Sequence, residues 1–282
     1  SRHIHSMWLR VWFIKYGRRY IMIRKKEMQN LTFCIPVRID SEYRLRNLLT
    51  ILKFYSHHLS SNYIVLEADN QQHVKELPHI PGLVYEFIYD ENPVFHRTHY
   101  INHMLSKVST ETAGIWDTDA VAPIAQLLQA HQRISDEQTI MAYPYDGRFW
   151  YINDFFSSLF CEKLDIRLLT DFDMPRRLMC GYYSVGGAFL VNVGRYRQYG
   201  WENENFIGWG PEDSERYKRL HILGQTPVRV PGSLYHLYHS RGINSGDRDA
   251  EVIYKTKKEY SRICGMMPEE LRKDIETWSW TK

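Results

Sequence analysis

Short apolar runs alternate with longer stretches of helical spacing along most of the chain, and this alternation restricts the fold more than any other feature. In Glu42–His58 the apolar residues recur every three or four positions, which is the spacing of one helix face. Leu31–Ile35 and Leu83–Tyr89 are apolar runs of the length that buried strands have. We expect strands at 31–35, 62–67, 83–89, 139–143 and 185–193 and one that ends at 119, with helices at 42–58, 98–108, 123–131 and 149–169. Strands that alternate with helices predict an α/β domain whose mixed, mostly parallel central sheet is flanked by helices.

The middle of the chain has no internal repeat and no linker rich in Pro, Gly or Ser, so a single domain is expected over residues 31–247. The composition, with 44% hydrophobic and 24% charged residues among 282, is that of an ordinary globular protein. Residues 248–282 form a polar tail that we expect to be mostly helical, with a last helix beginning at Pro268. Trp278 and Trp280 are expected to dock this tail on the domain.

The net charge of +3 is unevenly distributed, because residues 1–30 hold eight Lys or Arg against one Glu. Trp8, Trp12 and Phe13 stand among these cations, which is the composition of a segment at a membrane interface, although a terminal helix packed on the domain fits it equally well. No apolar stretch reaches the roughly 18 residues of a membrane span, and no signal peptide is visible. The four cysteines are widely spaced, which favours a reduced cytoplasmic setting, with the N-terminal segment at the inner face of the cell membrane.

The segment Ile115–Val121 is an apolar approach that ends in two acids, Asp117 and Asp119. In a strand, residues i and i+2 point to the same side, so the two carboxylates would converge at the carboxyl end of the strand, where α/β sheets bind ligands. Two converging carboxylates suit a hard cation such as Mn²⁺ or Mg²⁺. A turn or helix N-cap would explain the same two acids without any metal.

Two later motifs have the same double interpretation. Trp209 stands between glycines, where an aromatic face could stack on a sugar ring, and Glu212 and Asp213 follow at the expected start of a helix. Acids at a helix start are also favoured by the helix dipole alone. His236 and His239, three residues apart at the end of an expected strand, could both reach a metal held by Asp119, or each could be a structural histidine.

Read together and in order, these motifs resemble the GT-A-fold glycosyltransferases, above all the β-1,4-galactosyltransferase family and related bacterial polysaccharide transferases. The resemblance covers roughly residues 31–242. It rests on Pro36-Val-Arg38, Phe95-His-Arg97, Asp117-Thr-Asp119, Ser184-Val-Gly-Gly187, Trp209-Gly-Pro-Glu-Asp213 and His236-Leu-Tyr-His239.

The resemblance implies a GT-A (Rossmann-like) catalytic domain and a role for each matching residue. Asp213 would be the catalytic base, Glu212 would orient the acceptor and Trp209 would cover the donor and acceptor sugars. Mn²⁺ or Mg²⁺ would be held by Asp119, His236 and His239. The remaining contacts to the UDP-sugar would come from Pro36, Arg38, Phe95, Arg97, Asp117 and Gly187, with Asp117 supporting the ribose or a metal-bound water.

Three departures from the family pattern bear on specificity. His236 replaces a metal-binding Met and is a harder ligand that still suits Mn²⁺. Pro211 replaces a Gly, so loop motion on donor binding would be smaller or would pivot elsewhere. Ser184 stands where galactose-specific relatives tend to carry a bulky Tyr, which leaves room for an N-acetylated donor without excluding galactose.

The expected activity is an inverting, metal-dependent transfer of Gal, GalNAc or GlcNAc from a UDP-sugar to a saccharide or lipid-linked saccharide acceptor, in surface polysaccharide synthesis. No nucleic-acid partner is expected. A metal-dependent phosphoester hydrolase could use the same acids and histidines, with water as the acceptor. A non-catalytic carbohydrate or nucleotide binder on the same scaffold is the third interpretation, and the intact Asp213 argues against it.

Overall fold

Seven strands of the described chain form a central sheet in the order β12-β8-β11-β6-β3-β4-β5. The computed structural model describes residues 13–16, 19–22, 25–136, 139–171, 176–208, 210–240 and 250–282, the first two ranges by backbone alone. The strands are β3 (Lys26–Val37), β4 (Leu59–Asp69), β5 (Leu83–Tyr89), β6 (Thr112–Trp116), β8 (Met141–Tyr143), β11 (Ala188–Asn192) and β12 (Val228–Arg229). Of the pairings in this sheet, those of β11 with β6 and β8 are antiparallel and the others are parallel. The predicted α/β class with a mostly parallel sheet is confirmed.

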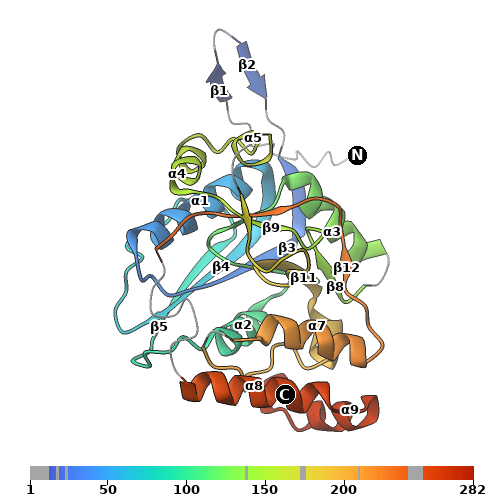
Figure 1. Ribbon diagram of the computed structural model, residues 1–282. Coiled ribbons are helices and arrows are strands. Elements are labelled where there is room, and N and C mark those ends of the chain that lie inside the picture. The colour runs from blue at the N-terminus through green and yellow to red at the C-terminus, as the bar shows by residue number, and fades with distance from the viewer. Residues whose placement is uncertain are drawn as a thin grey trace, which may run out of the picture.

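Helices cover both faces of this sheet (Figure 1). α1 (Glu42–His58) lies above it, whereas α2 (Arg97–Lys107) and α7 (Glu212–Ile222) lie below it. α1 has the predicted bounds because Ser41 caps it, its hydroxyl accepting a hydrogen bond from the backbone N–H of Arg44 at 3.3 Å. The other helices of the domain are α3 (Ile124–Asp136), α4 (Asp154–Lys163), α5 (Arg167–Thr170) and α6 (Val193–Gln198).

A second sheet of four strands, in the order β10-β9-β13-β7 within the described residues, adjoins the first. Its strands are β7 (Ala120–Val121), β9 (Phe149–Tyr151), β10 (Arg177–Leu178) and β13 (Leu234–His236). β7 and β13 are antiparallel, with His236 opposite Ala120. This pairing brings together two motifs that are more than a hundred residues apart in the sequence.

Two predictions of secondary structure are wrong, besides that of the strand expected to end at residue 119, which ends at Trp116. The helix expected over 149–169 begins instead with strand β9, because this aromatic run pairs with β13, and Asn153 then caps α4 by accepting a hydrogen bond from Phe156 N at 2.9 Å. The terminal helix considered for residues 1–30 is replaced, where the chain is described, by the antiparallel strands β1 (Phe13–Tyr16) and β2 (Arg19–Met22).

The C-terminal tail is helical, as predicted, with α8 (Ala250–Cys264), α9 (Pro268–Glu276) and a short 3₁₀ turn, η1 (Ser279–Thr281). Figure 1 shows α8 and α9 as an outer layer beneath α2 and α7. Leu223 at the end of α7 packs with Ile263, Leu271, Ile275 and Trp278 in a small apolar cluster. None of the helices in the described ranges is long and apolar enough to cross a membrane.

Candidate active site

The side chains of Asp119, His236 and His239 converge at the edge of the second sheet. Nε2 of His239 lies 3.2 Å from Oδ2 of Asp119, and Nε2 of His236 lies 3.7 Å from Oδ1 of the same carboxylate. One ligand atom from each of the three residues lies within 4.8 Å of the others. The strand pairing fixes this arrangement, because Leu237 N also donates a hydrogen bond of 2.8 Å to Asp119 O.

The chemistry of this cluster suits a divalent cation. One carboxylate and two imidazoles form a donor set that Mn²⁺ accepts. Burial lowers the pKa of His236 to about 4, so its ring is neutral at pH 7, which is the form that binds a metal. Its buried Nδ1 has no hydrogen-bond partner in the described part of the chain. Burial opposes ionisation of Asp119, but His236, His239 and Arg44 hold the pKa of its carboxyl well below the ordinary value.

Arg44 is a member of this cluster that the motifs did not reveal. From the first turn of α1 its Nη1 reaches to 3.5 Å from Oδ2 of Asp119, and its Nη2 lies 3.5 Å from Nδ1 of His239. A hydrogen bond of 2.9 Å from Nε to Asp40 orients the guanidinium. The signal that could have found it is weak, since an Arg in the first turn of a predicted helix that follows the first strand is common in any α/β protein.

Asp117 points to a different partner from Asp119, so the expected convergence of the two carboxylates on one strand is wrong. β6 ends at Trp116, and the two acids lie in the turn that follows it. Oδ1 of Asp117 accepts a 2.6 Å hydrogen bond from Nη2 of Arg97, at the start of α2. Its backbone N–H donates to Gly187 O at 2.9 Å, which joins the Asp117 and Gly187 motifs. Burial raises the pKa of Asp117, and Arg97 opposes this rise.

Arg38 and Phe95 also come together, beyond the carboxyl ends of β3 and β5. Cζ of Arg38 lies 5.3 Å from the centroid of the Phe95 ring. Arg38 is held by Asp90, which accepts a 2.8 Å hydrogen bond from Nη2, and by Ala68 O at 2.8 Å from Nε. Pro36, by contrast, is buried within β3 opposite Leu66. A nucleotide contact by these residues stays a prediction.

Asp213, the expected base, lies in the first turn of α7 against the glycine pair. A Cβ on Gly186 would lie 2.4 Å from Oδ2 of Asp213, so only glycine leaves room for this carboxylate. Oδ1 lies 2.9 Å from Nη2 of Arg216, a contact between opposite charges that lacks hydrogen-bond geometry. The Asp213 side chain is 30% exposed, whereas that of Arg216 is fully buried.

Arg216 is fixed from behind by Glu202, another residue that the motifs did not reveal. Nε and Nη2 of Arg216 donate hydrogen bonds of 2.8 and 2.7 Å to the two oxygens of Glu202, which also accepts one of 2.7 Å from Tyr196. Burial alone would raise the pKa of Glu202, but the Arg216 charge lowers it, so the pair is ionised. Arg216 follows Asp213 by three residues on α7, whereas Glu202 is brought to Arg216 only by the fold.

Glu212 differs sharply from its neighbour Asp213. Glu212 is 8% exposed, and no described residue makes a hydrogen bond to its Oε2. Burial, together with the Asp213 charge, raises the pKa of Glu212 to about 8, against the opposing influence of Arg97. Glu212 therefore carries a proton at neutral pH and can act as a hydrogen-bond donor.

Ser184 and Trp209 are the remaining residues of the motifs that bear on the sugars. Ser184 is buried, and its backbone holds its place, its N–H donating to Gly147 O at 3.0 Å and its carbonyl accepting from Arg229 at 3.0 Å. Trp209 lies outside the described residues, and its stacking role stays a prediction.

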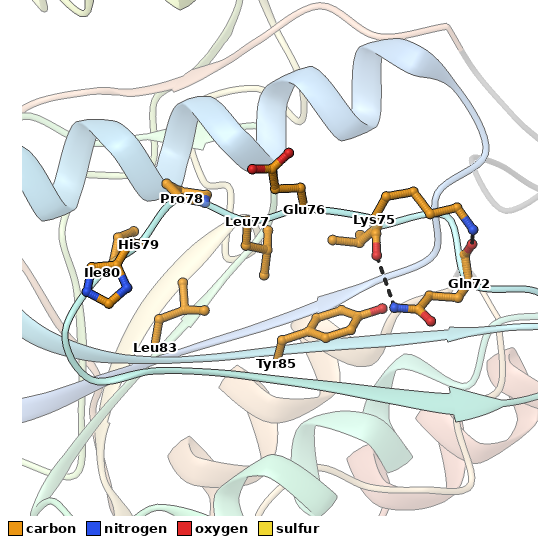
Figure 2. Close-up of a pocket in the computed structure, with 10 residues that line it drawn as sticks. Gln72, Lys75, Glu76, Leu77, Pro78, His79, Ile80, Leu83 and Tyr85 are labelled. Carbon is orange, nitrogen blue, oxygen red and sulfur yellow. Dashed lines mark hydrogen bonds between the residues drawn. The ribbon is translucent and has the colours of Figure 1, made fainter.

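A hollow of about 350 Å³ lies elsewhere, under the connection between β4 and β5 (Figure 2). Leu77, Ile80, Leu83 and Tyr85 form its apolar part, and none of the predicted site residues lines it. The connection is fixed there by the buried Glu67, which accepts hydrogen bonds from His73 N at 2.8 Å and from Tyr85 Oη at 2.5 Å. We therefore do not associate this hollow with the candidate active site.

Comparison with solved structures identifies the class of fold. GalNAc-T7, solved with UDP, GalNAc and Mn²⁺, superposes with a TM-score of 0.54 at 12% identity over 86% of this chain and 49% of its own. A β1,4-galactosyltransferase 7 of Drosophila with xylobiose has a TM-score of 0.48 at 16% identity over 85% and 82% of the two chains. Glucosyl-3-phosphoglycerate synthase of Mycobacterium tuberculosis has a TM-score of 0.48 at 12% identity over 84% of this chain and 78% of its own. The chain has the GT-A glycosyltransferase fold, as predicted.

A sequence comparison is more specific about one part of the chain. Residues 175–241 match the family model described as the N-terminal domain of galactosyltransferase. This stretch contains Gly186, Asp213, His236 and His239, so it holds most of the candidate active site. No curated protein sequence matches the chain.

Proposed function

We propose that this protein is a metal-dependent glycosyltransferase that moves a hexose from a UDP-sugar to a saccharide hydroxyl with inversion at the anomeric carbon. The observation that carries the proposal is the presence of two groups near Asp117 on a GT-A fold. One is the Asp119, His236 and His239 cluster, and the other is Asp213, held between Gly186 and Arg216. Besides burial, the charges of Asp119 and Asp213 both raise the pKa of Asp117. The similarity of residues 175–241 to a galactosyltransferase family model supports the same assignment.

Asp213 accepts the proton of the acceptor hydroxyl while the hydroxyl oxygen attacks the anomeric carbon. The bond from that carbon to the diphosphate oxygen breaks, and UDP leaves with the bonding electrons. A correctly placed general base contributes about 10²–10⁴-fold to such a step. Arg216 places a positive charge 2.9 Å from Oδ1 of Asp213, and Glu212, which is protonated at neutral pH, donates a hydrogen bond to the acceptor.

The donor is bound by groups at the carboxyl ends of the parallel strands. Arg38 and Phe95 contact the uridine, Arg97 holds Asp117 beside the ribose, and Gly187 borders the sugar. A divalent cation, Mn²⁺ or Mg²⁺, held by Asp119, His236 and His239, supplies positive charge to the leaving diphosphate when it is bound. Arg44 adds a second positive charge at the same place.

The buried serine at position 184 leaves GalNAc and GlcNAc, together with Gal, as the donor sugars to test. GalNAc-T7 was solved with UDP, GalNAc and Mn²⁺, and the Drosophila enzyme with a disaccharide, xylobiose. These complexes support a UDP-sugar donor and a saccharide acceptor. An acceptor linked to lipid, in surface polysaccharide synthesis at the inner face of the membrane, would explain the basic N-terminal segment.

A donor panel tests the proposal. UDP-Gal, UDP-GalNAc, UDP-GlcNAc and UDP-Glc are each incubated with Mn²⁺ and a set of mono- and disaccharide acceptors, and UDP release is measured. We expect one donor to be turned over in an acceptor-dependent way, and EDTA to abolish the reaction and weaken UDP binding. UDP release that is independent of acceptor would instead indicate a hydrolase, and UDP binding without any turnover would indicate a binder.

Asp213→Asn is the variant that tests the base. We expect UDP to bind with unchanged affinity in the presence of Mn²⁺ and transfer to fall by about 10²–10⁴-fold, because the amide cannot accept the proton. Asp165→Asn is the matched control, since Asp165 forms a surface ion pair with Arg167 on another part of the domain. Near-normal turnover by Asp213→Asn would refute the base assignment.

A further inference from the structure

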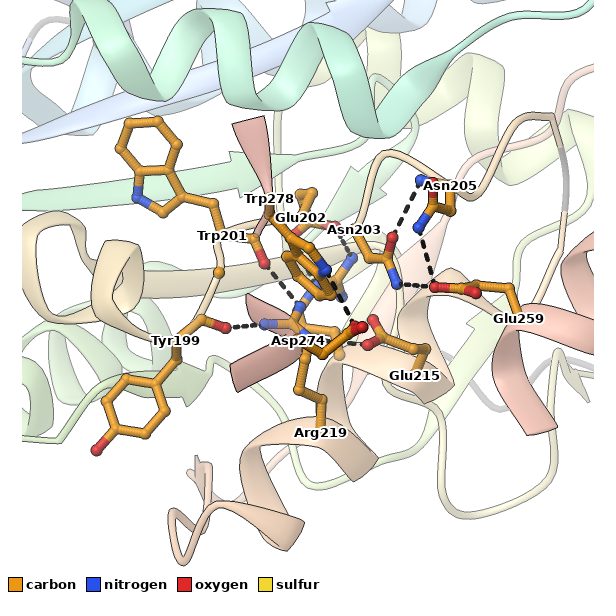
Figure 3. A network of polar contacts seen from close by, with 12 residues as sticks. Tyr199, Trp201, Glu202, Asn203, Asn205, Glu215, Arg219, Glu259, Asp274 and Trp278 are labelled. Atoms are coloured by element: carbon orange, nitrogen blue, oxygen red, sulfur yellow. Dashed lines mark hydrogen bonds and ion pairs between the residues drawn. The ribbon is translucent and has the colours of Figure 1, made fainter. Parts of the chain in front are cut away.

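We propose that the C-terminal helix α8 is part of the transfer machinery, and that Glu259 is a positioning residue for the segment that leads into the catalytic motif. This inference rests on the proposed function. The contact is direct (Figure 3), because Oε1 of Glu259 accepts hydrogen bonds from Nδ2 of Asn203 at 2.8 Å and from Nδ2 of Asn205 at 3.1 Å.

The same face of α8 follows the chain further toward Asp213. A Cβ on Gly208 would lie 3.3 Å from Cγ1 of Val252, and a Cβ on Gly210 would lie 3.2 Å from Thr256. Val252, Thr256 and Glu259 are spaced four and three residues apart, so they occupy one face of the helix. This face therefore contacts the chain immediately before and immediately after Trp209.

The opposite side of the segment is bound by α2, which carries Arg97 at its start. Thr98 Oγ1 donates a 2.8 Å hydrogen bond to Phe206 O, and Nδ2 of Asn102 donates one of 2.9 Å to Glu202 O. Residues 202–206 are thus fixed between α2 and α8. Because Glu202 in turn holds Arg216 against Asp213, displacement of this segment would move the base.

Glu259 is itself held in place by the rest of the tail. Arg262 donates hydrogen bonds of 2.7 Å to Glu259 and 2.8 Å to Asp274 of α9. Asp274 also accepts a hydrogen bond of 3.2 Å from Nε1 of Trp278 (Figure 3). The centroid of the Trp278 ring lies 5.3 Å from Cζ of Arg219 on α7. The tail is therefore tied both to the segment before the motif and to the helix that carries Asp213.

Glu259→Ala, with Lys258→Ala as the matched control, tests this inference. Lys258 is the exposed neighbour of Glu259 on the same helix. We expect Glu259→Ala to bind UDP and Mn²⁺ as the wild type does but to lose about 10- to 100-fold in transfer, since small misplacements of reacting groups cost that much. Hydrolysis of the donor by water should fall less than transfer, whereas a loss of folded protein would lower both equally. Glu259→Gln keeps an oxygen that can accept from Asn203 and Asn205 and should recover most of the transfer.

Hydrogen–deuterium exchange of the peptide covering residues 202–208 separates the failure of this inference from the failure of the proposed function. Faster exchange there in Glu259→Ala than in Lys258→Ala is expected whether or not a donor is found. Unchanged exchange, or a transfer-to-hydrolysis ratio equal to that of Lys258→Ala, would overturn the positioning role. If no UDP-sugar is turned over by the wild-type protein, the proposed function fails, and with it the catalytic role of α8.

Discussion

At the scale of single residues, Glu212 is a buried carboxyl group beside the charge of Asp213, and its ionisation opposes folding. Because the pKa of Glu212 is raised from 4.5 to about 8, the folded protein binds more protons than the unfolded chain between these values. The contribution of Glu212 to stability is therefore fully present below pH 4.5 and is lost as the pH rises toward 8.

Glu212→Gln, which resembles the protonated side chain, should remove this dependence. We expect the variant to be more stable than the wild type at pH 8 and to differ little at pH 5. Each pH unit between the two pKa values adds about 1.4 kcal/mol to the cost of ionising Glu212 in the folded protein, so the difference at pH 8 should be a few kcal/mol. Urea unfolding at the two pH values measures the difference. An equal gain in stability at the two pH values would show that Glu212 is ionised at both. Glu215→Gln cannot serve as the control, because Glu215 is paired with Arg219.

Gly186 determines whether the Asp213 carboxylate can occupy its place. A methyl group in Gly186→Ala would meet Oδ2 of Asp213 at 2.4 Å, so the carboxylate must rotate away or α7 must move. We expect transfer to fall by about 10²-fold while UDP binding is retained. Gly194→Ala is the control, because a methyl group there would lie 3.9 Å from its nearest neighbour, Oδ1 of Asn192. Equal activity of the two variants, measured as acceptor-dependent UDP release, would contradict the prediction.

At the scale of elements, the sequence predicts correctly those helices and strands whose bounds are determined by nearby residues. The bounds of α1 follow from its Ser41 cap, and those of β5 from a short apolar run, so both could be read directly. The strand at Phe149 was missed because a partner far along the chain, β13, overrides any helical spacing there. The turn after Trp116 likewise separates two acids that a continuous strand would have kept together.

The candidate site divides in the same way. Asp119, Asp213, His236 and His239 were selected because each belongs to a motif in which spacing carries chemical meaning. No motif indicates Arg44, Glu202 or Glu259. Each of them acts through a partner that is distant in the sequence, and only the fold brings the residue and its partner together. Long-range ion pairs of this kind leave no periodic pattern in a single sequence.

At the scale of the whole molecule, positive charge is concentrated at one end. Residues 1–24 contain six Lys or Arg and no acid, whereas the sheet begins with Lys26, which pairs with Leu59. Removal of residues 1–24 therefore leaves β3 complete, and a deletion that extends to residue 30 would cut into it. The shorter deletion can separate membrane association from folding.

We expect the protein without residues 1–24 to bind vesicles of phosphatidylserine and phosphatidylcholine at least tenfold more weakly, because each basic residue near an anionic surface contributes about 1 kcal/mol. Co-sedimentation measures this binding, with pure phosphatidylcholine vesicles and high salt as conditions in which the two proteins should behave alike. A second variant with the six cations changed to Gln separates charge from the aromatic side chains of the segment. Thermal unfolding and UDP binding should be unchanged by the deletion, since it removes only the separate two-stranded sheet of β1 and β2 and leaves the two larger sheets and the site residues. Unaltered association with the anionic vesicles would refute the membrane-interface role of this segment.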